Sequence, residues 1–272
     1  MKTLLIDMGN TRVKWALLRG AMPGRQHALP ISDWRGFEHA LRKLQRIASV
    51  QVVSVAGTRA ELALRAILQR LGLPKPQFLR STTQLAGVTN GYKDAWRLGA
   101  DRWVGAISAW HLAGARRAAC AVSVGTALTL DVVDAGGQHR GGLIAPGPAL
   151  MVRSLLQHTQ GIAPRAAGSS AAATRKFREA TIRPLADNTR DAIELGSLTA
   201  AAALIDRTLS AVRTALGARP VVMLTGGGAF VIAPLLVTRH QLCEDLVLQG
   251  LAIIARQSAQ ATAQQSPVRR RS

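Results

Sequence analysis

The residues best suited to chemistry lie at two glycine turns, each of which follows a short apolar run. Residues 4–11 read LLIDMGNT, and residues 119–131 read ACAVSVGTALTLD. Each run is typical of a buried strand, and a second apolar run follows each turn, so both segments are predicted β-hairpins. Such turns offer backbone N–H groups and a hydroxyl to a phosphate, and Asp7 could hold Mg²⁺ through water. With a third glycine loop in VVMLTGGGA at 221–229, the sequence predicts two similar halves that close on a nucleotide.

A further candidate site lies in residues 88–103, VTNGYKDAWRLGADRW, where Asp101 falls in the first turn of a predicted helix. A carboxylate there is either a structural charge at the helix N-terminus or a general base that takes a hydroxyl proton. In the second case Arg102 would neutralise a transferring phosphoryl group or a substrate carboxylate. Downstream, Gly141 and Gly142 of GGLIAPG would let the backbone approach a ligand, or belong to a plain strand-to-helix loop.

The composition limits the possible partners. The chain has 35 Lys and Arg against 15 Asp and Glu, a net charge of +20 that could indicate nucleic-acid binding. The arginines are instead spread along predicted helices without base-stacking aromatics, so we expect no specific nucleic-acid site. No apolar run reaches the roughly 18–20 residues of a membrane span, and no signal-peptide pattern opens the chain. We therefore expect a cytoplasmic protein with no membrane partner, whose Cys120 and Cys243 are reduced thiols.

Strands and helices alternate along the chain, which indicates an α/β fold. Neither a Walker A motif nor a G-x-G-x-x-G motif is present. Thr58 and Glu61 have the spacing of a capping box, and residues 163–187 have no clear period, which predicts an irregular insertion. The expected elements are a hairpin at 4–18, a helix at 33–48, a strand at 52–55, a helix at 58–72, a strand at 77–79, a helix at 99–113, a hairpin at 119–133, a strand at 141–145, a helix at 148–157, a helix at 189–216 and a helix at 249–260.

A boundary near residue 115 would separate two halves that each begin with a phosphate hairpin. Residues 1–115 would form the N-terminal half and residues 116–260 the C-terminal half. Residues 261–272 end in PVRRRS after a Gln- and Ala-rich stretch, and we expect a disordered basic tail.

Six motifs together resemble one known family. In chain order they are DMGNT, NGY…LGADRW, SVGTALTLD, GGLIAPG, LTGGGA and DLVLQGL. The set is similar to type III pantothenate kinase, the family also called Bvg accessory factor, in the acetate kinase, sugar kinase, Hsp70 and actin superfamily. The resemblance implies two actin-like (ribonuclease H-like) halves with a nucleotide cleft between them. It also implies ATP-dependent phosphorylation of pantothenate in coenzyme A synthesis, a homodimer, Mg²⁺, and a monovalent cation such as K⁺ or NH₄⁺.

The resemblance also assigns roles to individual positions. The phosphate and nucleotide positions would be Asp7 (with Mg²⁺ through water), Gly9, Asn10, Thr11, Lys14, Gly125, Thr126, Gly226, Gly227 and Gly228. Asp101 would be the catalytic base. The pantothenate positions would be Tyr92, Gly99, Ala100 and Arg102, together with Thr189, which would reach the partner subunit's pantothenate.

One position departs from the family pattern. Ser123 stands where many members carry Asp, which leaves the arrangement of the metal and K⁺ open.

Three alternatives to an active pantothenate kinase remain at this point. They are another small-molecule kinase of the same superfamily, an inactive family member, and a nucleic-acid-binding or transcription-accessory protein suggested by the charge.

Overall fold

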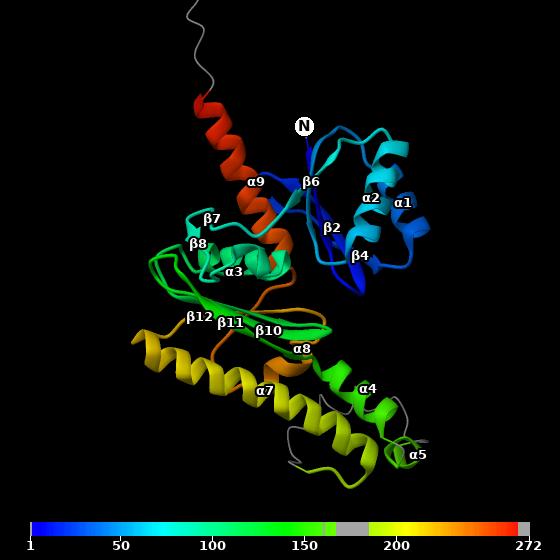
Figure 1. The fold of residues 1–272 in the computed structure, drawn as a ribbon, viewed down its shortest axis with the longest axis vertical. Helices are drawn as coiled ribbons and strands as arrows, with labels where there is room; N and C mark the ends of the chain where they lie inside the picture. The colour runs from blue at the N-terminus through cyan, green and yellow to red at the C-terminus, as the bar shows by residue number, and fades with distance from the viewer. Residues whose placement is uncertain (1, 160, 167–184, 266–272) are drawn as a thin grey trace, which may run out of the picture.

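The computed structural model describes residues 2–159, 161–166 and 185–265, and it contains two large mixed sheets (Figure 1). The first sheet has the order β3-β2-β1-β5-β6, with β4 also paired to β2. Its strands are β1 (Lys2–Met8), β2 (Arg12–Arg19), β3 (Met22–Pro23), β4 (His27–Pro30), β5 (Ile47–Ser54) and β6 (Pro76–Leu79). The β1–β2 hairpin is antiparallel and β5 runs parallel to β1, so the first glycine turn lies at the end of a central strand.

The outer face of the first sheet is covered by α1 (Trp34–Arg42) and α2 (Thr58–Arg70). Apolar side chains of both helices, such as Phe37 and Leu64, pack on alternate residues of β1 and β5, such as Ile6 and Val52. All four side chains are fully buried. This period-2 pattern directs the neighbouring residues of β1, Leu5 and Asp7 among them, to the opposite face of the sheet.

The second sheet has the order β11-β10-β9-β12-β13. Its strands are β9 (Ala119–Val124), β10 (Ala127–Val133), β11 (His139–Pro146), β12 (Val221–Thr225) and β13 (Gln241–Leu242). The long helix α7 (Thr189–Leu216) crosses its outer face, where Ala201, Ile205 and Leu209 pack on apolar residues of β9, β10 and β12 (Figure 1). The remaining elements are β7 (Gln84–Leu85), β8 (Val88–Thr89), η1 (Ala95–Arg97), α4 (Pro148–His158), α5 (Ile162–Ala166), α8 (Ala229–Ile232) and η2 (Ala233–Leu235).

Two helices fill the space between the sheets. The helix α3 (Ala100–Leu112) packs on β9 and β10, whereas α9 (Leu246–Gln265) packs on β1, β3 and β5. The two helices also pack on each other, and a side chain at Gly250 would overlap the backbone of Val104. A glycine in α9 therefore allows the close approach that joins the two sheet layers through one core.

The expected fold class, an α/β protein with two sheet-and-helix halves, is confirmed, and so are most of the expected elements. The long helix begins at Thr189 and ends at Leu216, with Gly217 in the left-handed conformation at φ 62. Most of the expected insertion at 163–187 lies outside the described residues, and the basic tail at 261–272 does so from residue 266. The division into residues 1–115 and 116–260 stays a prediction.

Three local expectations were wrong. The helix expected at 33–48 ends at Arg42, and Ile47 instead begins β5, because pairing with Lys2 of β1 outweighs the continuing apolar period. The capping box of Thr58 and Glu61 does not form, because Gly57 precedes the helix with φ 83 and Glu61 pairs with Arg80 at 2.7 Å. The last helix also begins at Leu246 rather than near 249, and it continues to Gln265, so residues 261–265 belong to α9 rather than to the expected disordered tail.

Candidate active site

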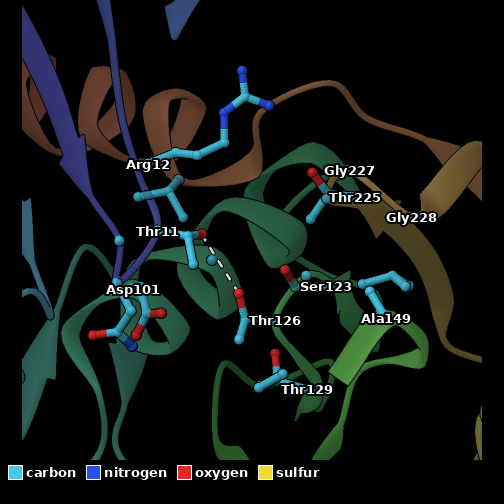
Figure 2. Close-up of a pocket in the computed structure, with 18 of the residues that line it drawn as sticks. Thr11, Arg12, Asp101, Ser123, Thr126, Thr129, Ala149, Thr225, Gly227 and Gly228 are labelled. Carbon is cyan, nitrogen blue, oxygen red and sulfur yellow. Dashed lines mark hydrogen bonds between the residues drawn. The ribbon is translucent and has the colours of Figure 1, made fainter. Parts of the chain in front are cut away.

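A cavity of about 910 Å³ lies between the two hairpins and is closed on one side by the glycine loop after β12 (Figure 2). It brings together most of the positions expected from the sequence. These are Asp7, Gly9, Asn10, Thr11, Lys14, Asp101, Arg102, Ser123, Gly125, Thr126, Gly226, Gly227 and Gly228. Residues from the first hairpin and from α3 therefore face residues from the second hairpin across one space.

The turns of the two hairpins meet at their tips. Figure 2 shows Thr11 and Thr126 pointing toward each other, and their hydroxyl oxygens lie 3.5 Å apart. Each turn is closed by a backbone hydrogen bond of 3.0 Å, from Gly9 N–H to the Arg12 carbonyl and from Gly125 N–H to the Ala127 carbonyl. Two hydroxyls and two sets of turn amides thus converge, which is the donor arrangement that phosphate oxygens require.

The third glycine loop is seated directly on the second hairpin. Gly226 has φ 97, and a side chain there would overlap the backbone of Val124. The N–H of Gly228 donates to the Val124 carbonyl at 2.9 Å, while nothing lies within 4 Å of a side chain added at Gly227. Gly226 and Gly228 are therefore required for the close approach, and Gly227 leaves open space toward the cavity.

Two buried carboxylates enclose a lysine at the edge of the cavity. Lys14 Nζ lies 3.9 Å from Asp7 Oδ2 and 3.1 Å from Asp245 Oδ2. Burial, together with the charge of Asp245, raises the pKa of Asp7 to about 8, although Lys14 opposes this. Burial lowers the pKa of Lys14, but the two carboxylates outweigh it and the pKa is raised overall. The cluster therefore holds one ammonium group between two acids whose charges disfavour each other.

These acids fit a magnesium ion of the kind that nucleotides carry. Among the described residues no group of three or more His, Cys, Asp or Glu side chains could by itself enclose a metal ion. Mg²⁺ in phosphate-transfer sites usually keeps several waters and takes one or two protein carboxylates together with substrate phosphates. Asp7 and Asp245 line the same cavity as Ser123 and Thr225, which carry hydroxyls, and this set of oxygen donors fits that pattern.

Asp101 lies at the start of α3, on the side of the cavity below Thr11 (Figure 2). Its Oδ1 accepts a hydrogen bond from the backbone N–H of Arg102 at 2.9 Å. Burial raises its pKa, while the backbone hydrogen bonds of the helix start oppose the shift. Both interpretations of Asp101 are thus physically present, because the carboxylate accepts from a helix N-terminus and also faces the cavity.

Arg102 is held by a bidentate ion pair. Its Nε donates to Asp131 Oδ2 at 2.9 Å and its Nη2 to Asp131 Oδ1 at 2.7 Å, while Nη1 donates to the Tyr92 hydroxyl at 3.1 Å. A side chain at Gly142 would overlap both Asp131 and Arg102. Gly142 therefore makes room for this pair rather than bringing the backbone close to a ligand in the cavity, as one reading of GGLIAPG expected.

Comparison with known proteins identifies the family. The family model of type III pantothenate kinase matches residues 3–211. The chain belongs to the type III pantothenate kinase family. A type III pantothenate kinase of Nitrosococcus oceani is 35% identical over 263 residues, which cover 94% of each chain, and one of Aromatoleum aromaticum is 37% identical over 259 residues, which cover 95% of this chain and 99% of the relative.

Solved structures support the actin-like architecture at low sequence identity. A conserved putative Baf family transcriptional activator from Campylobacter jejuni has a TM-score of 0.54 at 17% identity, covering 94% of this chain and 99% of its own. A ROK family glucokinase from Streptomyces griseus, in complex with glucose and AMPPNP, has a TM-score of 0.52 at 11% identity, covering 96% and 100%. MreB5 of Spiroplasma citri bound to ADP has a TM-score of 0.53 at 10% identity, covering 97% and 99%.

Four of the positions predicted to hold pantothenate do not line the cavity, as far as the structure describes the chain. Tyr92 contacts it only through the Arg102 guanidinium. Gly99 precedes α3 as its cap residue, and Ala100 is buried in the core. Thr189 is the first residue of α7, after Asn188, whose side chain caps the helix. No partner chain is present, so the expected contact of Thr189 with a second subunit stays a prediction.

Sequence reasoning missed two residues that shape the site. Asp245 precedes α9, and its Oδ1 accepts from the Leu248 N–H at 2.9 Å, so the acid that opens the DLVLQGL motif could have been recognised as a helix cap. His139 lies in β11, with Nε2 3.1 Å from Asp131 Oδ1. No local pattern marks His139, because its partners come from α3 and β10.

Proposed function

We propose that this chain transfers the γ-phosphoryl group of ATP to the hydroxyl of pantothenate, which gives 4'-phosphopantothenate, the first intermediate of coenzyme A synthesis. The observation that carries the proposal is the convergence of Thr11, Thr126 and Asp101 on one cavity in a member of this family. Phosphoryl transfer requires positioning and charge neutralisation more than covalent chemistry by the protein. A cavity that joins phosphate-binding turns to a buried carboxylate supplies both.

The nucleotide end of the reaction uses the two hairpins and the loop of Gly226, Gly227 and Gly228. Turn amides and the two threonine hydroxyls bind the phosphates, and the open space at Gly227 admits the adenosine. Lys14 places a cation next to the phosphates. Asp7 would hold Mg²⁺ through water, and that ion would neutralise charge on the β- and γ-phosphates.

At the acceptor end, Asp101 takes the proton of the pantothenate hydroxyl. Its raised pKa moves it toward the range in which a carboxylate is an effective base near neutral pH. Arg102, the next residue of the helix, lines the same cavity. Asp101 lines the same cavity as Thr11, and its charge acts on Asp7 of the first hairpin, so the hydroxyl that it activates would be close to the transferring phosphoryl group.

The position of Arg102 favours the substrate carboxylate over the phosphoryl group. The cavity is lined by Thr126 in the turn and then by alternate residues of β10, which are Ala127, Thr129 and Asp131. The five residue steps from Thr126 to Asp131 span roughly 17 Å at about 3.4 Å per residue. Arg102 is fastened to Asp131 and therefore lies well away from the hairpin tip. We assign it to the carboxylate at the far end of pantothenate.

A coupled assay of ADP release tests the proposal directly. Purified protein with Mg²⁺ and ATP should release ADP with pantothenate but not with a panel of sugars or with acetate, and mass spectrometry should find phosphopantothenate. Turnover of a sugar or acetate instead would support another kinase of the superfamily. Absence of turnover with every acceptor would support an inactive member.

We also propose a homodimer, in which Thr189 reaches the partner subunit's substrate. Support comes from apolar side chains on the surface of the second half: Ile144 of β11 is 64% exposed, Leu143 is 43% exposed and Leu155 of α4 is 39% exposed. A second copy of the chain would cover such residues. Light scattering at the assay concentration should give the mass of a dimer, and a fully active monomer would exclude the arrangement.

Three further assignments complete the proposal. Activation by K⁺ or NH₄⁺ is open to a titration of either salt, with Ser123 as the position of interest. Arginines such as Arg42, Arg65 and Arg70 lie on exposed helix faces, so non-specific nucleic-acid binding at low salt should vanish near physiological ionic strength. We assign the protein to the cytoplasm, which is supported by the free thiols of Cys120 and Cys243. No helix within the described residues has the length and apolar character of a membrane span.

A further inference from the structure

A buried chain of contacts runs from β11 to the cavity through His139, Asp131 and Arg102. We infer that Asp131 and His139 are positioning residues that fix Arg102 at the acceptor end, so that its remaining N–H groups select an acceptor that carries a carboxylate. The inference rests on the proposed function and deepens it by naming what sets the specificity for the acid.

The ion pair fixes the guanidinium plane. Arg102 and Asp131 are both buried, and their two parallel hydrogen bonds join α3 to β10. With the third bond to Tyr92, the hydrogen bonds within the described residues leave two of the five N–H donors of the guanidinium for a ligand. Because Asp131 neutralises the charge of Arg102, a bound carboxylate is recognised by donors in fixed places rather than by net charge.

His139 fixes the carboxylate of Asp131 in turn. Its side chain is fully buried, with Nε2 3.1 Å from Asp131 Oδ1. The imidazole ring packs against Tyr92 at 5.9 Å and against Trp103 at 6.4 Å between ring centroids. Its Nδ1 is buried with no hydrogen-bond partner among the described residues. This geometry fits the neutral tautomer whose proton is on Nε2 and is donated to Asp131.

Two glycines make room for the arrangement. A side chain at Gly142 would overlap Asp131 and Arg102, and one at Gly91 would overlap the backbone carbonyl of His139. Residues of four separate segments therefore converge on one guanidinium. A pair that served only to pack α3 on β10 would not need the additional donor on His139, because Asp131 already receives two hydrogen bonds from Arg102.

The test compares two acceptors that differ only in the acid group, pantothenate and pantothenyl alcohol. His139→Phe keeps a buried ring and removes the donor to Asp131. We expect the KM for pantothenate to rise about tenfold, the scale of one lost hydrogen bond to a charged group. The KM for the alcohol, the KM for ATP and kcat should stay within about threefold. The preference for the acid over the alcohol should therefore fall about tenfold.

Three further variants make the result decisive. His139→Met replaces the ring with a flexible apolar side chain and serves if the Phe variant does not fold. His139→Gln restores a donor and should recover most of the preference. His111→Phe is the matched control, since His111 also packs on a tryptophan and bonds a backbone carbonyl, at 2.8 Å, but does not contact Arg102.

The outcomes separate the inference from the proposed function. A folded His139 variant with an unchanged preference, or an equal loss for both acceptors, would overturn the positioning role while leaving the kinase proposal intact. The same loss of preference in His111→Phe would also overturn it. A parent protein that phosphorylates neither acceptor would overturn the proposed function itself.

Discussion

The two phosphate hairpins have matching backbones but different charges. In the first, Asp7 of β1 pairs across the ladder with Lys14 of β2. In the second, Ser123 of β9 pairs with Thr129 of β10 at the corresponding place, one residue before the strand end. At these matched positions the first hairpin therefore presents a buried acid and a lysine to the cavity, whereas the second presents two hydroxyls. The acid of the second hairpin, Asp131, lies farther along β10 and is paired with Arg102.

The difference implies a division of labour between hairpins that share one geometry. Backbone amides and the facing hydroxyls of Thr11 and Thr126 are common to both turns and can bind phosphate from either side. Next to the turns, the charged side chains belong to the first hairpin, where Asp245 adds a second carboxylate beside Lys14. We therefore expect metal and cation effects to follow substitutions in and around the first hairpin more strongly than in the second.

The largest effect is expected outside both hairpins, at Asp101. Asp101→Asn keeps the shape and removes the proton acceptor, so kcat should fall about 10²–10⁴-fold, the usual cost of losing a general base. Binding of ATP and pantothenate, measured by calorimetry, should persist. Asp33→Asn is the matched control, because Asp33 caps α1 through the Gly36 N–H at 2.9 Å and lies away from the cavity. A kcat within a few-fold of the parent would show that Asp101 is only a structural charge at the N-terminus of α3.

The next effect is expected at Asp7, where metal handling and pH are linked. Its pKa is raised from 3.8 to about 8 in the folded protein. Between these values the folded state binds more protons than the unfolded state, so the free energy of unfolding falls as pH rises. Without metal, Asp7→Asn should remove this decline and be more stable than the parent above pH 8, as thermal melts across pH 5–9 can measure.

Added metal should reverse the order of stability of the parent and the Asp7→Asn variant. Mg²⁺ requires an ionised carboxylate, so added Mg²⁺ and ATP should raise the melting temperature of the parent more at high pH than at low pH. Asp7→Asn should show little of this Mg²⁺-dependent increase, and its turnover should need more Mg²⁺. An equal Mg²⁺ response in parent and variant would place the ion elsewhere.

The sequence predicted those features of the two hairpins and of α7 that depend on residues close together in the chain. Both hairpins follow from short apolar runs and glycine turns, and α7 follows from an Ala-rich period that ends at Gly217. The wrong helix end near Ile47 depended on pairing with a distant strand. The partners of the site residues are non-local in the same way: Asp131 lies 29 residues from Arg102, and Asp245 reaches Lys14 from the far end of the chain. Residue types and their local spacing do not predict which distant residues come into contact.

A smaller effect is expected at Asp245, which sharpens the role of the first hairpin. Asp245→Asn keeps the Oδ1 that caps α9 and removes the charge beside Lys14. The Lys14 ammonium would then be held less firmly in its place next to the ATP phosphates. The KM for ATP should therefore rise about two- to tenfold, the range of one net hydrogen bond. Because the charge of Asp245 raises the pKa of Asp7, the pH profile of Mg²⁺ stabilisation should also move to lower pH.

Asp206→Asn provides the control for Asp245. Like Asp245, Asp206 accepts backbone hydrogen bonds with its carboxylate, here from Val237 at 3.0 Å and Thr238 at 2.9 Å, but it does not line the cavity. Its variant should leave the KM for ATP unchanged. If Asp245→Asn shifts neither the KM nor the pH profile, Asp245 is only a helix cap.

The smallest effect is expected at Ser123, where a substitution would make the two hairpins alike. Ser123 lies between Thr129 and Thr225 on neighbouring strands, and Figure 2 shows its side chain beside the cavity. Ser123→Asp adds a hard oxygen ligand where hydroxyls now stand. A half-buried charge in this place contributes about 0.2–1 kcal/mol, so activation by K⁺ or NH₄⁺ should change by less than about fivefold. Ser123→Asn controls for shape. Identical salt activation in the parent and both variants would show that the second hairpin does not contact the cation.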